Sequence, residues 1–209
     1  TPIQLTIDRL KSKYSEKIVD HEKDDFSKSL LIIGKQIKQI ENLVNEFSDF
    51  ARMPKPILKD NNLISLLKDT IKLTNELDNK IIIDFKAGKS EISLNSDSEQ
   101  LSRVFFNLIK NSIESIQDKK IDNVDLIGKI DISINENVEK INFIIIDNGL
   151  GFGIFEENIK NILNPYFTTK KKGTGLGLSI VNKIINDHNG KINFVSLESG
   201  AKIEIMFIK

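Results

Sequence analysis

A heptad pattern in the first quarter of the chain restricts its possible folds most strongly. Between residues 26 and 51, apolar residues recur at alternating steps of four and three, with Lys, Gln, Glu and Asp between them. The series is Phe26, Leu30, Ile33, Ile37, Ile40, Val44, Phe47 and Ala51. A seam this narrow and this long is typical of a coiled coil or a helix bundle. We therefore predict one long helix that needs a partner along most of its length.

A shorter helix is predicted ahead of the seam. Its apolar positions are Ile3, Ile7, Leu10 and Tyr14, and Pro2 suits its first turn. The polar stretch 19–25 is expected to join the two helices, with Asp24 or Asp25 as a cap for the second. His21 then falls in this connection, as a solvated loop histidine.

Two such helices cannot cover their apolar seams alone. A dimeric four-helix bundle built from two copies of the hairpin is the arrangement we favour, and packing on the chain's own C-terminal domain is the alternative. Pro54 and Pro56 end the long helix, because proline lacks an N–H and disfavours helix before it. We place the domain boundary there, giving domains 1–53 and 54–209.

The rest of the chain alternates helical and strand-like segments. Helical periodicity marks a segment beginning near Asp60 and two more over 99–116 and 178–188, with Asp97 or Ser98 as the cap of 99–116. Strand-like segments are 80–86, 129–135, 140–146, 191–195 and 201–208, of which the last four form two hairpins. We predict an α+β domain with a mostly antiparallel sheet and helices on one face. No βαβ repeat appears, which argues against a Rossmann domain.

A glycine-rich loop leads directly into the last helical segment. Gly173, Gly175 and Gly177 stand at every second position, with Thr174 and Leu176 between them. Alternating glycines let backbone N–H groups turn toward an anion, and the following helix offers its positive N-terminal end. Ordinary turns and linkers share this composition, so the function of the loop depends on other residues.

Three further patterns supply candidate residues. Asn107 and Asn111 share one helix face, where their amide oxygens suit Mg²⁺ beside a polyphosphate; two solvated asparagines are the alternative. Asp147 follows a strand in DNGLGF, and its carboxylate is suited to accept a hydrogen bond from an exocyclic amine such as that of adenine. A plain turn is the alternative. Residues 164–170, NPYFTTK, suit either a lid over phosphates or a surface loop.

In this order, the four stretches resemble the ATP-binding boxes of sensor histidine kinases. NLIKN at 107–111 is similar to the N box, DNGLGF to the G1 box, NPYFTTK to the F box and GTGLGL to the G2 box. The resemblance covers 56–209 and implies the Bergerat α/β sandwich that these kinases share with gyrase and MutL. Residues 1–53 resemble the dimerisation and histidine-phosphotransfer hairpin of the family. FSDFARMPKP at 47–56 is similar to the connector of the NtrY-like, nitrogen-sensing branch.

The resemblance implies a role for each matching residue. Asp147 would bind the adenine amine, and Asn111 would ligate Mg²⁺ with Asn107 assisting, as the catalytic pair. The other nucleotide-binding residues that it implies are Asn148, Gly149, Gly151, Tyr166, Phe167, Lys170, Lys171, Lys172, Gly173, Thr174, Gly175, Leu176 and Gly177. The implied reaction transfers the γ-phosphoryl group of ATP to a histidine and then to an aspartate on a response-regulator receiver domain.

Two departures from the family pattern refine this expectation. Related enzymes that hydrolyse ATP carry Glu where Asn107 stands, and an amide cannot accept a proton from water, so phosphoryl transfer is favoured over hydrolysis. The family's phosphoacceptor lies in a motif such as HEIKNPL just ahead of the matching TPIQ, whereas this sequence begins at Thr1. Neither His21 nor His188 matches that motif. We therefore expect this fragment to bind ATP without phosphorylating itself on histidine.

Charge and composition exclude several other functions. Lys+Arg and Asp+Glu both number 30, so no basic excess indicates nucleic acid, and the absence of cysteine excludes thiolate chemistry. We expect a homodimer formed through the N-terminal hairpin, and a cytoplasmic fragment of a membrane-anchored sensor kinase that does not itself contact the membrane. The competing hypotheses are an ATP-hydrolysing enzyme of the gyrase or MutL type and a non-catalytic dimeric binding module.

Overall fold

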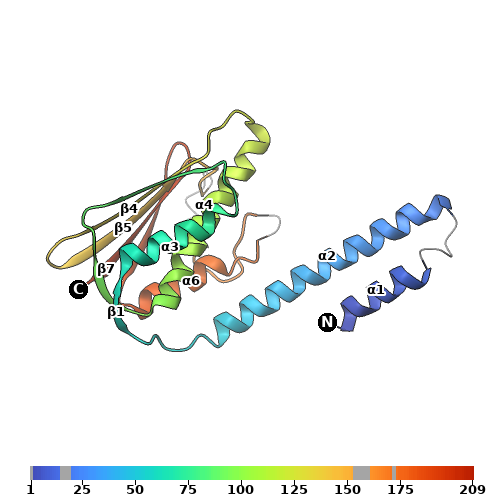
Figure 1. Ribbon diagram of the computed structural model, residues 1–209, viewed down its shortest axis with the longest axis horizontal. Helices are drawn as coiled ribbons and strands as arrows, with labels where there is room; N and C mark the ends of the chain where they lie inside the picture. Colours follow the sequence, from blue (N-terminus) through green and yellow to red (C-terminus); the bar gives the residue numbers. More distant parts are fainter. Residues whose placement is uncertain (1, 15–19, 153–160, 171–172) are drawn as a thin grey trace. The chain divides into compact units, whose positions relative to one another are not determined.

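The computed structural model divides the chain into two compact units, Thr1–Met53 and Pro54–Lys209. It describes residues 2–14, 20–152, 161–170 and 173–209, shown in Figure 1. Lys171 and Lys172, two of the predicted nucleotide-binding residues, lie outside these ranges. None of the helices in the described ranges is long and apolar enough to cross a membrane.

The first unit consists of α1 (Pro2–Tyr14) packed against α2 (Asp20–Ala51). The prediction of a polar connection through residue 25 is wrong, because α2 already begins at Asp20. Asp24 and Asp25 therefore lie inside the helix and do not cap it, and His21 belongs to its first turn. Charged residues lack the strong helix-breaking effect of glycine and proline, so a polar start does not prevent a helix. The helix ends at Ala51, ahead of the two prolines as predicted.

The second unit is built on a sheet of five strands in the order β2-β4-β5-β7-β6. The strands are β2 (Ile82–Ala87), β4 (Lys129–Glu136), β5 (Lys140–Asp147), β6 (Lys191–Ser196) and β7 (Ala201–Ile208). Strands β4 and β5 form one antiparallel hairpin and β6 and β7 form the other, and β5 also pairs antiparallel with β7. Of the strands described here, β2 and β4 alone pair in parallel, and the chain between them includes α4. The predicted mostly antiparallel sheet is confirmed.

Among the described residues, the helices that lie over one face of this sheet are α3 (Leu63–Asn75), α4 (Ser98–Asp122) and α6 (Gly177–Asp187) (Figure 1). The helix α4 packs between the other two and against β4 and β5. Its apolar face is fully buried, and the Phe105 ring lies 5.0 Å from that of Phe143 on β5. Asp97 caps α4 as predicted, because its Oδ1 accepts hydrogen bonds from the N–H groups of Glu99 and Gln100. The predicted α+β class is confirmed.

A second, two-stranded sheet was not predicted. It pairs β1 (Lys59–Asn62) with β3 (Ser93–Ser96) in antiparallel register. The polar sequences KDNN and SLNS have neither the alternation nor the β-branched residues that mark a strand. The helix expected from near Asp60 consequently begins at Leu63, and Asn62 caps it by accepting a hydrogen bond from the N–H of Ile64.

Candidate nucleotide-binding site

A buried carboxylate at the end of β5 forms the centre of the site. Asp147 is only 6% exposed, although it is charged at neutral pH in its ordinary state. Burial raises the pKa of Asp147, and hydrogen bonds from the N–H of Gly149 and the hydroxyl of Ser112 oppose that rise. The backbone of Ala201 donates a further hydrogen bond, so these donors leave about one of the carboxylate's roughly four lone-pair positions for a ligand.

One stripe of α4 holds the turn that follows Asp147. Ser112 donates a hydrogen bond to Asp147 Oδ2 at 2.9 Å, and Ser115 Oγ accepts one from the N–H of Leu150 at 2.9 Å. One turn further along, Lys119 Nζ donates to the carbonyl oxygens of Asn148 and Gly149, each at 2.9 Å. Spacings of three and four residues place these side chains on one helix face. Sequence reasoning missed all three, because Ser and Lys at such spacings are common on ordinary helix surfaces.

Glycines allow the turn to pack without side chains between it and its neighbours. A Cβ on Gly149 would lie 2.4 Å from Ser115 Oγ and 2.8 Å from the Ser115 carbonyl carbon. Gly151 has φ +72, and a Cβ there would lie 2.5 Å from the carbonyl oxygen of Gly200, in the β6–β7 turn. Gly200 itself has φ +94, and a Cβ on it would lie 1.8 Å from the Asp147 carbonyl oxygen. The β6–β7 turn therefore forms a wall of the site.

A second stripe of α4 carries Asn107 and Asn111, and both side chains are partly exposed. Lys170 approaches this stripe from the 164–170 segment, with its Nζ 3.4 Å from Asn111 Oδ1. The amide oxygens are ligands of the kind that Mg²⁺ prefers, and a cation already lies against one of them. This donor chemistry fits a magnesium ion held by Asn111 with Asn107 nearby.

The glycine loop and the 164–170 segment lie against each other. Gly175 has φ +71, and a Cβ there would lie 2.4 Å from the Tyr166 carbonyl carbon, so only glycine permits this approach. The N–H of Tyr166 donates to the Gly175 carbonyl oxygen at 3.1 Å, and that of Phe167 donates to the Asn164 carbonyl oxygen at 3.2 Å. Two of the four motifs thus pack against each other through their backbones.

The remaining candidates lie at the start of α6 and at the end of β5. Gly177 is the first residue of α6, Leu176 is its buried N-cap residue, and Thr174 Oγ1 accepts a hydrogen bond from the Leu176 N–H at 3.4 Å. Gly173 is exposed, and its N–H donates a hydrogen bond to the carbonyl oxygen of Lys170 at 3.3 Å. The Asn148 side chain bonds the backbone of Ile127 and Lys129 and thereby secures the start of β4.

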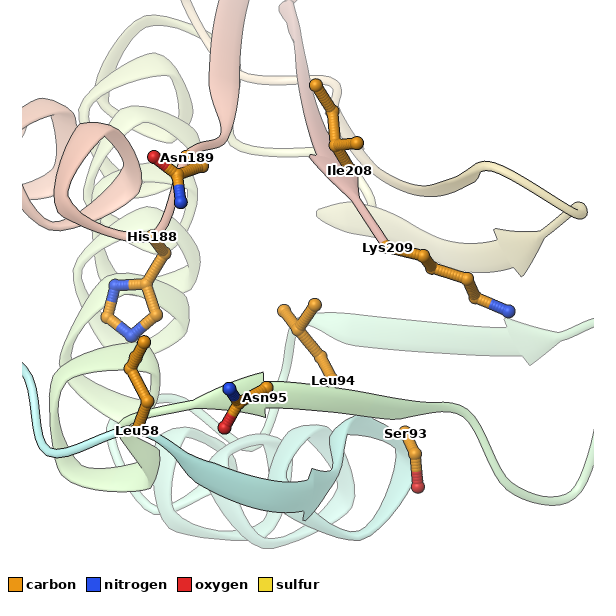
Figure 2. Close-up of a pocket in the computed structure, with 8 residues that line it drawn as sticks. All are labelled: Leu58, Ser93, Leu94, Asn95, His188, Asn189, Ile208 and Lys209. Atoms are coloured by element: carbon orange, nitrogen blue, oxygen red, sulfur yellow. The ribbon is translucent and has the colours of Figure 1, made fainter.

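A separate cleft of about 570 Å³ lies at the other end of the sheet (Figure 2). Its lining includes Ile208, which pairs with Lys140 at the start of β5, whereas Asp147 at the end of β5 pairs with Ala201. This cleft is therefore not the site around Asp147. Figure 2 shows the ring of His188 at its edge, beside Leu58.

His188 joins α6 to the start of α4 at this far end. Its buried ring accepts a hydrogen bond from the Asp97 N–H at Nε2, 2.9 Å away, which assigns the Nδ1 proton to the Ile184 carbonyl oxygen at 2.8 Å. Burial favours a higher pKa for Asp97, but hydrogen bonds from the N–H groups of Ile57, Gln100 and Glu99 outweigh it and lower the pKa. The carboxylate of Asp97 thus also holds the segment that enters the second unit.

Comparisons with known proteins agree with this geometry. Residues 96–209 match the family described as histidine kinase-, DNA gyrase B-, and HSP90-like ATPase. A putative NtrY-like sensor histidine kinase of Rickettsia felis is 35% identical over 99% of this chain and 33% of its own length. The nitrogen regulation protein NtrY of Azorhizobium caulinodans is 34% identical over 96% of this chain and 25% of its own length. The chain thus spans a third or less of these relatives.

Solved structures show the same relationship. The catalytic domain of histidine kinase ThkA, 32% identical, covers 73% of this chain and is itself 95% covered, with a TM-score of 0.62. A second match is the structure of ThkA in complex with the response regulator protein TrrA, with 26% identity and a TM-score of 0.72. The alignment spans 100% of this chain and 58% of the ThkA chain. The chain belongs to the histidine kinase-, DNA gyrase B- and HSP90-like ATPase family, in its NtrY-like sensor histidine kinase branch.

Proposed function

We propose that this chain is the ATP-binding catalytic part of a protein-histidine kinase. The buried carboxylate of Asp147 carries the proposal, because it keeps acceptor capacity at the bottom of a glycine-lined turn. In this function Asp147 accepts a hydrogen bond from the exocyclic amine of adenine, and Gly149 and Gly151 let the ring approach. Such a carboxylate selects adenine, since guanine carries an oxygen at the corresponding position.

The phosphates in this proposal lie between the second stripe of α4 and the glycine loop. Asn111, with Asn107 nearby, holds Mg²⁺, which neutralises phosphate charge and orients the γ-phosphoryl group. Lys170 supplies a positive charge, and the loop from Gly173 to Gly177 presents N–H groups ahead of α6. Phe167 and Tyr166 are the proposed lid residues. Transfer then depends mainly on positioning and on charge neutralisation.

The acceptor in this proposal is an imidazole on the helical unit of the longer protein, from which a response-regulator aspartate takes the phosphoryl group. Two copies of α1 and α2 form a homodimeric bundle, because one chain leaves most of the α2 seam exposed. His188 is unsuited to be an acceptor, since both of its ring nitrogens are hydrogen-bonded and the ring is buried. We expect labelled ATP to leave no acid-labile phosphate on this chain.

Calorimetric titration with a non-hydrolysable ATP analogue tests the nucleotide site. The wild-type chain should bind the analogue, and Mg²⁺ should tighten the binding. Asn111→Ala should remove most of the Mg²⁺-dependent gain, at least about tenfold, or about 1.4 kcal/mol. Asn186→Ala is the matched control, because Asn186 is an exposed helical asparagine on α6 and should leave binding unchanged.

Two results would contradict the proposal. If the wild-type chain binds no analogue with or without Mg²⁺, the site is not a nucleotide site, and the binding-module hypothesis is favoured. If the chain turns over ATP steadily at rates on the order of 1–10³ s⁻¹, hydrolysis of the gyrase or MutL type is favoured instead.

A further inference from the structure

An acidic side chain beside the proposed phosphate site has no role in the function described so far. Glu114 lies on α4 three residues after Asn111 and seven after Asn107, so all three share one helix face. An acid on this face is unexpected, because it repels the phosphates of a nucleotide bound next to it. Its presence therefore needs a physical reason.

The reason lies in its contact with Lys170. Lys170 Nζ lies 2.5 Å from Glu114 Oε2 and 3.4 Å from Asn111 Oδ1. On its other side, Glu114 Oε1 is 3.8 Å from Lys110 Nζ, on the preceding turn of the same helix. The ammonium group of Lys170 thus contacts the carboxylate of Glu114 and the amide oxygen of Asn111 at the same time.

Lys170 and a magnesium ion cannot occupy this place at once. Two cations held by the same amide oxygen repel each other strongly, so the ion displaces the ammonium group when it binds Asn111. The Lys170–Glu114 pair is weak enough to exchange, because its side chains are 30% and 37% exposed and solvent screens such pairs. A polyphosphate, with several negative charges, is a stronger partner for Lys170 than one carboxylate.

We propose that Glu114 is a positioning residue that holds Lys170 beside Asn111 while the site has no nucleotide and releases it to the phosphates when a magnesium–nucleotide binds. This inference rests on the proposed nucleotide site. Without nucleotide, the Glu114 carboxylate is the anion that pairs with Lys170, where a phosphate pairs with it later. The Lys170 ammonium group likewise lies beside Asn111, where the metal ion binds later. The exchange keeps charges paired in both states and moves only a flexible lysine side chain.

A double-mutant cycle measured by calorimetry tests the exchange. Glu114→Gln keeps the size of the side chain and removes its charge, so Lys170 no longer has to leave a carboxylate. We expect it to tighten binding of the magnesium–ATP analogue about three- to fivefold at physiological salt. In a Lys170→Met background, where there is no ammonium group to release, only the direct repulsion between Glu114 and the phosphates remains, so the gain from Glu114→Gln should be at least about twofold smaller than with Lys170 present.

Asp118→Asn is the matched control, because it removes the same charge one turn further along the same helix from an exposed position. It should change the affinity by less than about 1.5-fold in both backgrounds. The inference is overturned if Glu114→Gln and Asp118→Asn have equal effects, if Glu114→Gln weakens binding, or if its gain is as large without Lys170 as with it. A wild-type chain that binds no nucleotide would overturn the proposed function, and this inference with it.

Discussion

The two units of this chain use amphipathic helices with opposite outcomes. In the sheet unit, the apolar face of α4 is covered, and Val104, Phe105 and Leu108 have no exposed surface. In the helical unit, an equally regular pattern leaves Ile40 59% exposed and Phe47 47% exposed. The periodicity of apolar residues thus shows that a face needs cover, and it does not show which part of the protein provides it.

The comparison also explains where the site can form. The same α4 that fills the core carries Ser112, Ser115 and Lys119 on one polar stripe and Asn107 and Asn111 on another. Because its apolar face is packed against the sheet, these side chains are held in place before any ligand binds. In the described part of the helical unit, much of the apolar seam of α2 stays exposed, and in our proposal this seam becomes an interface when a second copy binds.

The largest effect should come from the core of the sheet unit. Phe143→Ala removes a fully buried ring that packs against Phe105, and it should lower the free energy of unfolding by about 3–5 kcal/mol. Urea unfolding measures this loss, which should not depend on protein concentration. A loss that varies with concentration would show that the sheet unit also needs a second copy.

A charge in the exposed seam should have a large effect of a different kind. Ile40→Asp should weaken dimerisation by at least about a hundredfold, or about 2.7 kcal/mol, because two copies would each bury a carboxylate. Light scattering over a range of concentrations measures the dissociation. Lys38→Asp, at an exposed charged position of the same helix, is the control. A wild-type chain that stays monomeric at high micromolar concentration would contradict the bundle.

A smaller effect is expected at the far end of the sheet unit. His188→Ala leaves the buried Asp97 N–H without its acceptor and removes the ring's hydrogen bond to the Ile184 carbonyl oxygen, which keeps the one from the His188 backbone N–H, and it should cost about 1–2 kcal/mol of unfolding free energy. The loss should appear in urea unfolding of the sheet unit and not in dimer dissociation. Asn186→Ala, at an exposed position of α6, is the control. The neighbouring Asn189 is unsuitable, because its φ of 55 is one that alanine adopts only with strain. An unchanged unfolding free energy would show that the ring does not join the two helices.

Periodicity and motifs were sufficient to predict most of this fold. The helix over 99–116, its cap at Asp97 and the two hairpins follow from local patterns, and each is present. The strands β1 and β3 did not follow, because their polar sequences become strands only by pairing with each other. The start of α2 at Asp20 was missed for a related reason, since polar residues carry no periodic signal at a helix end.

The site was predictable in its motifs and not in its contacts. Asp147, Asn111 and the glycines stand out by type and spacing. The hydrogen bonds of Ser112 and Lys119, and the ion pair of Glu114 with Lys170, join residues more than 25 positions apart. Such partners depend on how the helix lies against the turn and the loop, which only the folded structure determines.

The central claim is that Asp147 is kept as a buried carboxylate for ligand binding and at a cost to stability. Burial raises the pKa of Asp147 in the folded state above its value in the unfolded chain. The folded protein therefore loses stability as the pH rises from the unfolded-state pKa through the folded-state pKa, and the charged carboxylate is destabilising at neutral pH. Asp147→Asn removes the charge and keeps the shape of the side chain. Neutralising Asp125, which is exposed, is the control.

The most direct measurement is therefore a calorimetric titration of wild type, Asp147→Asn and Asp125→Asn with the magnesium–ATP analogue, paired with urea unfolding of each at pH 7. We predict that Asp147→Asn binds more than about tenfold more weakly, or by at least about 1.4 kcal/mol, and is no less stable than wild type without ligand. Asp125→Asn should match wild type in both. Undiminished binding by Asp147→Asn, with wild-type affinity measurable, would contradict the central claim.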